Sequence, residues 1–377
     1  MKILLVGEYS RLHNSLKEGL VKLGHEVTII GSGDEFKKYP VDIRVSHNYH
    51  KGWRKKFMVV CHKLFGINLK ANSIKKQFFS HADRLKGYDV VQLINESPLG
   101  ANPKVEMEVI SFLKEHNKKL FLLSCGTDHL SVKYALEKKF RYSILTPLFE
   151  GKVTELDFDP ILKYIRPEFR RLHEFVFDAV EGVIASDLDY HIPLEGHEKY
   201  LGMIPNPINT EAIAYREPEL GGKVVIFHGI NRAGYYRKGS DYFVKALKRL
   251  QQSHGDHIEI ITVESVPYAE YIKLYDRAHI LLDQVLGYDQ GYNALEAMAK
   301  GKVVFTGAER EHTEYYNLKT TVAINATPDP NQIYEALVNL VESSEKIQEI
   351  SRSARAFIEQ EHHYLKIAKK YMDIYTA

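Results

Sequence analysis

Short apolar runs that alternate with longer helix-period segments restrict the fold of this chain more than any other feature. The runs cover residues 3–6, 27–30, 90–94, 120–124 and 182–185 in the first half, and 223–228, 258–263, 280–283 and 302–306 in the second. They are largely continuous rather than alternating, which is typical of strands buried on both faces of a parallel sheet. The pattern therefore predicts a layered α/β fold with parallel sheets.

The strand series starts anew near residue 223, after a segment that reads Ile-Pro-Asn-Pro-Ile-Asn-Thr over residues 204–210. Pro205 and Pro207 keep that segment extended and without regular pairing. We interpret it as the crossing between two doubly wound domains. The expected division of the chain is an N-terminal domain over 1–203, a C-terminal domain over 204–350 and a helical tail over 351–377 that crosses back.

The composition is that of an ordinary globular protein, with 44% hydrophobic and 27% charged residues among 377 and a net charge of +2. Cys61 and Cys125 are the only cysteines and lie far apart, which argues against a structural zinc site or a disulfide framework. The four apolar residues after Lys2 indicate a strand and not a signal peptide. We therefore expect a cytoplasmic protein with the size of an enzyme.

One stretch has a distinct charge pattern. Between Ile43 and Ala82 there is no Asp or Glu, whereas nine Lys and Arg residues alternate with aromatic and aliphatic ones. Such a stretch, over 44–79, is typical of a segment that lies on an anionic membrane surface. The alternative is a pair of surface helices whose apolar face packs on the domain. Nucleic acid is not expected as a partner, because the remaining charge is balanced and no nucleic-acid motif is present.

Two loops of the first half follow predicted strands, where open α/β sheets bind their ligands. Gly7, Glu8 and Tyr9 follow the first strand, and the glycine permits a tight turn beside a substrate. Glu96 follows the third strand on the same argument. A structural turn explains Gly7 equally well, and the single glycine is not a dinucleotide-binding fingerprint.

A third loop of the first half contains Asp128 and His129, directly after residues Cys125-Gly126-Thr127. An aspartate beside a histidine supplies a general base or a partner for an acceptor hydroxyl. The alternative is structural, because Asp is also a good N-cap for the helix that follows.

The second half carries a loop rich in glycine and positive charge, from Phe227 to Asp241, with Arg232, Arg237 and Lys238 in it. Positive charge at the end of a strand and before a helix suits a diphosphate. The spacing of a P-loop is absent. A solvated basic loop is the alternative.

A further segment joins a loop, Gly291, a short helix with Glu296 on it, and Gly301. A helix that begins near Gly291 directs its free N–H groups at the preceding loop and favours an anion there. Glu296 lies about a turn and a half further on, within reach of a hydroxyl beside that anion. An anion next to a sugar hydroxyl describes a nucleotide-sugar.

With these residues in place, the second half resembles the donor-nucleotide domain of the GT-B glycosyltransferases, which have two Rossmann-like domains facing a cleft, and specifically the retaining glycosyltransferase family 4. Residues 204–211 are similar to that family's interdomain IPNGID stretch. Arg237-Lys238-Gly239 resembles its GR…KG loop, and residues 291–301 resemble GFGLPVLEAMACG. The resemblance covers about 200–370 well and the first half only in general layout.

The resemblance implies roles for individual residues. Lys238 and, displaced from the family's position, Arg232 would bind the donor diphosphate together with the backbone at Gly291 and Tyr292. Glu296 corresponds to the second glutamate of the family's pair, which binds the donor ribose, and Asn293 falls beside the sugar. The first glutamate of the pair is missing: its position holds Tyr288, and Asp289 is adjacent.

The resulting expectation is a hexosyltransferase that moves a sugar from an NDP-sugar to a glycan, lipid-linked or other acceptor, with retention and without a metal or other cofactor. The N-terminal domain would bind the acceptor, with Glu8, Asp128 and His129 as catalytic candidates. The expected setting is cell-surface polysaccharide biosynthesis, in the cytoplasm or, through the basic stretch 44–79, on the inner face of a membrane. The alternatives are an inverting transferase, a nucleotide-sugar epimerase, and a non-catalytic protein that binds nucleotide-sugars or serves assembly.

Overall fold

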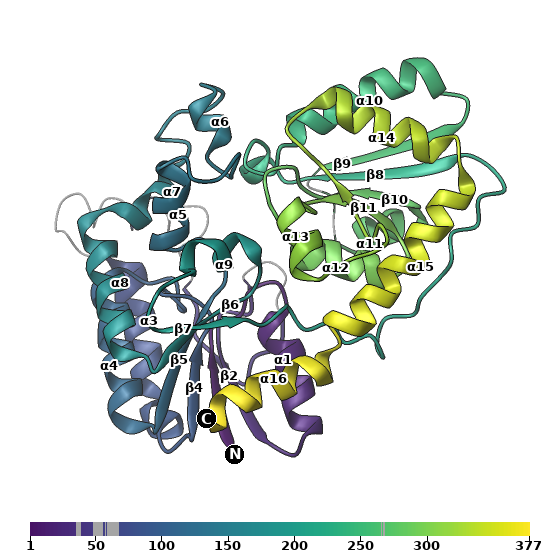
Figure 1. The fold of residues 1–377 in the computed structure, drawn as a ribbon. Coiled ribbons are helices and arrows are strands. Elements are labelled where there is room, and N and C mark those ends of the chain that lie inside the picture. The colour runs from purple at the N-terminus through teal and green to yellow at the C-terminus, as the bar shows by residue number, and fades with distance from the viewer. Residues whose placement is uncertain (35–38, 48–55, 57, 59–67, 265, 267) are drawn as a thin grey trace.

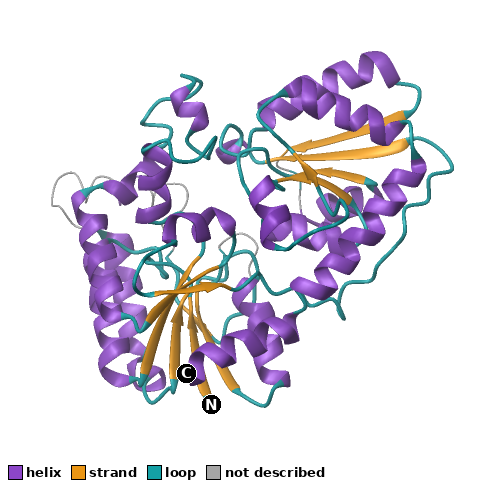
Figure 2. Ribbon diagram, viewed as in Figure 1, coloured by secondary structure: helices purple, strands orange, loops and turns teal. Residues whose placement is uncertain are grey.

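The computed structural model describes residues 1–34, 39–47, 56, 58, 68–264, 266 and 268–377. It contains two parallel sheets, each with helices on both faces, and the two domains are joined by extended chain and by the C-terminal helices (Figures 1 and 2). The predicted α/β fold with two doubly wound domains is confirmed.

The N-terminal domain is built on a seven-stranded sheet in the order β3-β2-β1-β4-β5-β6-β7. Each neighbouring pair of strands is parallel, and β1 lies between β2 and β4 with Leu4 opposite Thr28 and Val91. The strands are β1 Lys2–Val6, β2 Glu26–Gly31, β3 Ile43–Arg44, β4 Val90–Leu93, β5 Lys119–Ser124, β6 Gly182–Ala185 and β7 Tyr200–Met203.

The two faces of this sheet are covered by different helices, because successive strand residues point to opposite sides. Leu4 and Val6 share a buried cluster with α3 Leu69–Ser80, α4 Pro103–His116 and α8 Pro167–Ala179. Ile3 and Leu5 pack instead with α1 Leu12–Lys22 and the C-terminal helix α16 Tyr364–Thr376. Shorter helices follow the carboxyl ends of the strands: α5 His129–Leu136, α6 Thr146–Phe149, α7 Asp159–Leu162, η2 Lys163–Ile165 and α9 Leu188–Leu194. The 3-10 helix η1 Ala82–Leu85 instead leads into the amino end of β4.

The C-terminal domain has a five-stranded parallel sheet in the order β12-β11-β10-β8-β9. Its strands are β8 Val224–Ile230, β9 Ile258–Glu264, β10 Ile280–Leu282, β11 Val303–Thr306 and β12 Ile324–Asn325. One face packs on α10 Ser240–His254 and α14 Pro330–Val341. The other helices of this half are η3 Arg232–Gly234, α11 Tyr268–Arg277, α12 Tyr292–Ala299, α13 Arg310–Tyr315 and α15 Ser344–Glu361.

The C-terminal tail returns to the first domain, as predicted. In Figure 1 the yellow helices α15 and α16 run from the second sheet back to α1. Ile208 of the crossing forms a bridge with His363 between them, and its N–H donates to the His362 carbonyl at 2.7 Å. A single buried cluster includes residues of both sheets together with Ile204, Ile208, Ile367 and Tyr371. The domain boundaries at 203/204 and 350/351 stay predictions, and α15 continues through the second of them.

The nine strands expected from apolar runs all form, within one or two residues of their expected ends. β3, β7 and β12 were not expected. They are edge strands of two to four residues, too short to show a periodic pattern.

Much of the basic stretch 44–79 lies outside the described residues. In its described part, Ile74 and Phe78 of α3 are buried in the domain, and Lys75 pairs with Glu108 of α4. The alternative of packed surface helices is thus seen for α3. Among the described residues, no helix is both long and apolar enough to span a membrane.

Candidate active site

The carboxyl ends of the two sheets face each other across the domain interface. Several contacts join them, including the following hydrogen bonds. The N–H of Leu188, after β6, donates to Asp289 Oδ2 at 3.2 Å, and the N–H of Tyr288, after β10, donates to both Asp189 oxygens at 3.1 Å. Ser15 Oγ of α1 lies 2.5 Å from the Tyr292 hydroxyl of α12. Open α/β sheets bind ligands at these edges, so the candidate site lies here.

A lysine and a helix start meet on the C-terminal side of this interface. Lys238 Nζ lies 3.1 Å from Asp283 Oδ1, and Asn293 Nδ2 donates to the same oxygen at 3.0 Å. The Asp283 side chain is 2% exposed, whereas Lys238 is 38% exposed. Asp283 therefore holds the cation of Lys238 beside the first turn of α12, with the ammonium still open to solvent.

Two glycines let the chain come close at this point. Gly239 has a φ of 69°, and a Cβ there would stand 2.5 Å from Val285, so only glycine fits between the two loops. Gly291 differs, because a Cβ on it would lie at an ordinary 3.8 Å from Asp283 Oδ2 and Gln284 Oε1. A small group can therefore approach the Gly291 backbone without a clash.

Helix α12 begins at Tyr292 with Gly291 as its N-cap, and no side chain caps its first turn. The N–H groups at such a start have no partner within the helix and carry positive potential. Next to Lys238, this start is suited to an anion with two or more charges.

Glu296 lies further along α12, half-buried, and close to the N-terminal domain. Although burial opposes the charged form of Arg11, the carboxylates of Glu18 and Glu296 raise the pKa of that residue. Arg11 therefore reaches the neighbourhood of Glu296 across the interface. Sequence reasoning missed Arg11; its place in the loop after the first strand was the available signal.

Arg232 lies away from Lys238 in this conformation. Its guanidinium pairs with Glu264 at the end of β9 and is 63% exposed. Tyr292 contributes more than backbone, since its ring is buried and its hydroxyl donates to the Pro207 carbonyl at 3.1 Å. The predicted diphosphate residues thus divide: Lys238, Gly291 and Tyr292 come together, and Arg232 does not join them.

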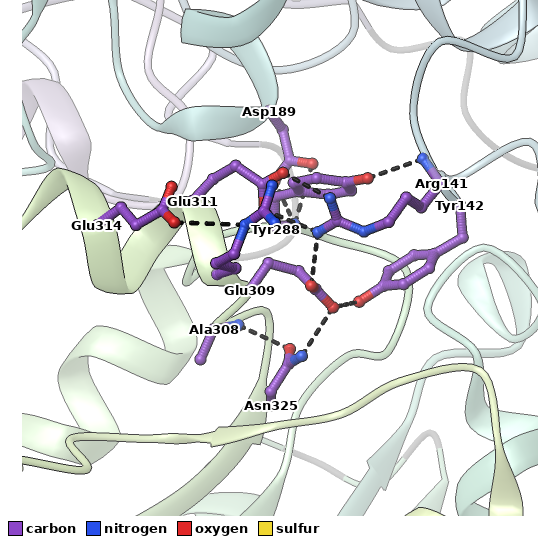
Figure 3. Close-up of polar contacts among 10 residues, drawn as sticks. Arg141, Tyr142, Asp189, Tyr288, Ala308, Glu309, Glu311, Glu314 and Asn325 are labelled. Atoms are coloured by element: carbon purple, nitrogen blue, oxygen red, sulfur yellow. Dashed lines mark hydrogen bonds and ion pairs between the residues drawn. The ribbon is translucent and has the colours of Figure 1, made fainter.

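Tyr288, at the position of the missing glutamate, is engaged by the N-terminal domain (Figure 3). Its hydroxyl accepts from the Arg141 N–H at 2.8 Å, and its ring lies between Phe140 and Tyr142, with centroid distances of 5.0 and 5.6 Å. The Arg141 guanidinium stands 4.8 Å over the same ring. Tyr288 is 2% exposed, so it acts as a packing residue of the domain interface.

Ion pairs surround Tyr288 and tie the domains together (Figure 3). Arg141 contacts Glu309 at 2.6 Å and Glu311 at 2.5 Å. Glu309 also accepts from Tyr142 and, at 2.7 Å, from Asn325 Nδ2. Sequence reasoning missed this cluster, because its members come from separate loops and a helix that no motif connects.

Both oxygens of the Asp289 carboxylate are already engaged, so Asp289 is not available to replace the missing glutamate. One carboxylate oxygen caps α9 through the Leu188 N–H, and the other accepts from the Gln290 N–H at 2.7 Å. Burial, and then the nearby charge of Asp289, raises the pKa of Asp189 to about 7. Asp289 therefore serves the domain contact in this structure.

On the N-terminal side, the turn after β1 is strained. Gly7 has a φ of 90°, and Ser10 and Arg11 have φ values of 52° and 74°, which non-glycine residues seldom adopt. A Cβ on Gly7 would stand 2.3 Å from Ile94, so glycine is required. Strain of this kind clusters at functional sites, which favours the functional interpretation of Gly7, Glu8 and Tyr9.

Glu8 is a buried carboxyl with a raised pKa. It is 1% exposed, and burial raises its pKa to about 7. Glu8 Oε2 accepts from Asn14 N at 2.9 Å and Nδ2 at 2.5 Å, whereas Oε1 has no hydrogen-bond partner among the described residues. A buried carboxyl with a pKa near neutrality is a candidate for proton transfer, and a catalytic role for Glu8 stays a prediction.

Tyr9 follows strand β1, as Glu8 does, and Glu96 follows the neighbouring strand β4. The Tyr9 hydroxyl donates weakly to the Ser97 carbonyl at 3.4 Å. Glu96 is buried and 2.6 Å from His173 Nδ1, and the ring of His173 stacks on that of His129 at 4.7 Å. Burial raises the pKa of Glu96 and lowers that of His129, which keeps the histidine neutral.

Asp128 is the N-cap of α5. It accepts from the Ser131 N–H at 2.8 Å within a capping box, and its other oxygen accepts from the Ser124 hydroxyl. The structural alternative for Asp128 is therefore realised. His129 Nδ1 donates to the Tyr164 carbonyl at 2.9 Å. Catalytic roles for Asp128 and His129 stay predictions.

Within the described part of the chain, no group of three or more His, Cys, Asp or Glu side chains is placed to hold a metal ion. The absence of a cofactor requirement stays a prediction.

Comparison with known proteins gives one family match, to a model described as glycosyl transferase-like, over residues 237–373. That segment begins at Arg237, holds the Lys238, Gly291 and Glu296 positions, and ends in α16. A search of curated protein sequences finds no match.

Solved structures resemble the whole chain. Sucrose-phosphate synthase from Thermosynechococcus elongatus matches with a TM-score of 0.62 at 15% identity, covering 100% of this chain and 98% of that one. HepE from Anabaena, in complex with UDP and glucose, matches with 0.59 at 12%, covering 100% and 99%. A putative UDP-N-acetylglucosamine 2-epimerase from Listeria monocytogenes matches with 0.52 at 10%, covering 98% and 94%.

Identities this low show a shared fold. Two parallel-sheet domains, the returning C-terminal helix and these matches together establish that the chain has the GT-B glycosyltransferase fold.

Proposed function

We propose that this protein is a glycosyltransferase that moves a hexose from a nucleoside-diphosphate sugar to an acceptor bound by the N-terminal domain. The observation that carries the proposal is the meeting of Lys238, Asp283 and Asn293 at the uncapped start of α12. A fixed cation and a helix start together stabilise the charge of a diphosphate. The glycosyl transferase-like family match over 237–373 supports it.

The reaction joins an acceptor hydroxyl oxygen to the anomeric carbon as the bond from that carbon to the diphosphate breaks. Lys238 and the α12 N–H groups would stabilise the negative charge that grows on the leaving diphosphate. Glu8 would orient the acceptor hydroxyl and accept its proton. The interdomain contacts at Tyr288 and Tyr292 close the site and exclude water, which would otherwise hydrolyse the donor.

The donor is proposed to be a UDP-sugar first, because similar structures are described as complexes with UDP, with UDP-glucose, or with UDP and glucose. Glu296 would bind the ribose hydroxyls, as its counterpart does in the resembled family. The sugar itself meets Asn293 and, in place of a carboxylate, the neighbourhood of Tyr288. Retention at the anomeric carbon and independence of metal are part of the proposal.

A second candidate is epimerisation of a nucleotide-sugar. Two observations favour it: the sugar-contacting glutamate expected at residue 288 is a buried tyrosine, and one of the similar structures is described as a putative UDP-N-acetylglucosamine 2-epimerase. The residues proposed to bind the nucleotide-sugar would then be the same, but no acceptor would be needed.

The experiment is a thermal-shift panel of UDP- and GDP-sugars, followed by measurement of NDP release and of sugar isomerisation. A nucleotide-sugar that raises the melting temperature, with NDP released on addition of a glycan or lipid-linked acceptor, is the expected result. Isomerisation without NDP release would favour the epimerase. If no nucleotide-sugar raises the melting temperature, both proposals and a non-catalytic binding role fail together.

For localisation, we propose a cytoplasmic protein that associates with the inner face of a membrane through 44–79. The support is the sequence of that stretch alone, with nine cations and no acidic residue. Co-sedimentation with vesicles that is the same with and without anionic lipid would remove this proposal.

A further inference from the structure

Three consecutive residues in the first turn of α1 each bond to a different part of the molecule. His13, Asn14 and Ser15 are 0%, 8% and 0% exposed. His13 contacts Gly7 and begins a series of hydrogen bonds that leads to the C-terminal helix. Asn14 contacts Glu8, and Ser15 contacts Tyr292 of the opposite domain. One helical turn thus touches the candidate base, the donor helix and the tail.

The hydrogen-bond series from His13 to Tyr375 is buried along its whole length. Tyr375 of α16 donates from its hydroxyl to Gln92 Oε1 at 2.6 Å. Gln92 Nε2 lies 3.2 Å from His13 Nε2, and His13 Nδ1 lies 2.8 Å from the Gly7 carbonyl. Tyr375, Gln92 and His13 are all 0% exposed.

The chemistry of the groups sets the direction of every bond in this chain. The Gly7 carbonyl can only accept, so His13 Nδ1 carries the proton. Burial lowers the pKa of His13 to about 4, so the ring is neutral and its Nε2 accepts from the Gln92 amide. The remaining oxygen of Gln92 is then the acceptor for Tyr375. The bonds therefore run in one direction, from Tyr375 through Gln92 and from Gln92 to His13, and His13 donates to the Gly7 carbonyl.

Asn14 and Ser15 continue the arrangement on the cleft side. Asn14 donates twice to Glu8 Oε2, from its backbone and its side chain. The Tyr292 hydroxyl gives its proton to the Pro207 carbonyl, so the bond between Ser15 and Tyr292 is donated by Ser15. This bond exists only while the two domains are together.

We propose that the first turn of α1 positions the Glu8 carboxyl and couples it to closure of the domains, with His13, Asn14 and Ser15 as positioning residues. The inference rests on the proposed function only for the role it gives Glu8. Two bonds of Asn14 favour the ionised carboxylate, and burial opposes it. In the turn that carries Asn14, His13 is linked through Gln92 to Tyr375, and Ser15 bonds directly to Tyr292. Loss of either hydroxyl weakens the Asn14 bonds and makes Glu8 harder to ionise.

The test is to measure the pKa of Glu8 in the ligand-free protein by carbon-13 NMR of labelled glutamate. The Glu8→Gln variant identifies the signal. Asn14→Ala should raise the pKa of Glu8 by about one unit, the equivalent of one charge-assisted hydrogen bond. Tyr292→Phe and Tyr375→Phe should raise it in the same direction by less. Tyr88→Phe is the matched control, since its buried hydroxyl bonds only to the Arg84 carbonyl among the contacts recorded in the described chain.

Equal pKa values of Glu8 in wild type, Tyr292→Phe and Tyr375→Phe would overturn the coupling. These variants remove one oxygen each, and a melting temperature near that of Tyr88→Phe confirms that they fold. Should Asn14→Ala not fold, Asn14→Ser takes its place.

The proposed function is tested separately. A nucleotide-sugar panel without any shift in melting temperature would refute it while the Glu8 response stands. Donor binding with an unresponsive Glu8 would refute the coupling alone.

Discussion

The two edges that face each other across the cleft present opposite chemistry. The C-terminal edge offers a solvent-accessible cation, Lys238, beside an uncapped helix start. The N-terminal edge offers buried carboxyls, of which Glu8 and Glu96 have raised pKa values because burial penalises their charge. The first edge suits a ligand that arrives with several negative charges, and the second suits proton transfer.

The difference also concerns how each edge is held in place. Lys238 and Asn293 share one oxygen of Asp283, so the C-terminal edge is organised by contacts within its own domain. The N-terminal edge also depends on other parts of the molecule, because Ser15 bonds to Tyr292 of α12 and His13 is linked through Gln92 to Tyr375 of the tail. The contacts described at Lys238 thus lie within one domain, whereas the turn beside Glu8 has a contact across the domain interface.

Removal of the charge at Glu8 should have the largest effect on rate. Glu8→Gln should slow NDP release by about 10²- to 10⁴-fold, the contribution typical of a general base. Glu106→Gln is the matched control, since Glu106 is also fully buried and burial raises its pKa to about 7. Equal rates for both variants would remove Glu8 from the chemistry.

The raised pKa of Glu8 also predicts that the stability of the protein depends on pH. The folded-state pKa of Glu8 is raised from 4.5 to about 7, so its favourable contribution is present below 4.5 and is lost as pH rises through 7. Glu8→Gln should therefore stabilise the protein at pH 8, by about 3 kcal/mol as an upper order of magnitude, and have little effect at pH 4. Thermal unfolding at the two pH values measures this, and a variant less stable at pH 8 would contradict the burial of an ionised Glu8.

A smaller effect is expected from Gly291→Ala on the donor edge. The added Cβ meets no atom closer than 3.8 Å and requires no positive φ, so the fold should be unchanged. It occupies the space where a diphosphate approaches the backbone, which should weaken NDP-sugar binding by about tenfold, the equivalent of one lost hydrogen bond. Calorimetry decides, and undiminished affinity would place the diphosphate elsewhere. Gly222→Ala, at an exposed glycine that has no positive φ and open space around its Cβ direction, controls for glycine replacement.

The smallest effect on activity is expected at Asp128. Asp128→Ala should lower stability by about 1 kcal/mol through loss of the helix cap, whereas Asp128→Asn keeps a capping side chain and should leave NDP release within about twofold. An Asp128→Asn variant that folds normally but has lost activity would restore the catalytic interpretation.

The donor edge could be predicted from sequence because it depends on short-range order. Lys238-Gly239 and Gly291 to Glu296 are contiguous segments with fixed spacing, and backbone groups perform much of their work. Asp283 was not predicted as a site residue, because it had been assigned to the end of the preceding strand. Arg232 was expected at the site, but its guanidinium pairs with Glu264.

The N-terminal edge could be predicted only as a set of loops. Whether Glu8 or Asp128 is available depends on tertiary burial and on the helix that each one faces, which no local pattern contains. The role of Tyr288 in the interface likewise depends on Arg141 and Glu309, far away in sequence. Nine strands, the first helix, the helix after Gly291 and the helical tail were predicted, whereas the short edge strands depend on their neighbours and were not.

The central claim is that a nucleoside diphosphate binds between Lys238 and the start of α12, with Glu296 on its ribose. Calorimetric titration of the best-binding nucleotide-sugar into wild type, Lys238→Ala and Glu296→Ala tests this directly. The account predicts that each variant binds about 10- to 100-fold more weakly, as expected for one charged hydrogen bond. Affinity equal to wild type in both variants would contradict it.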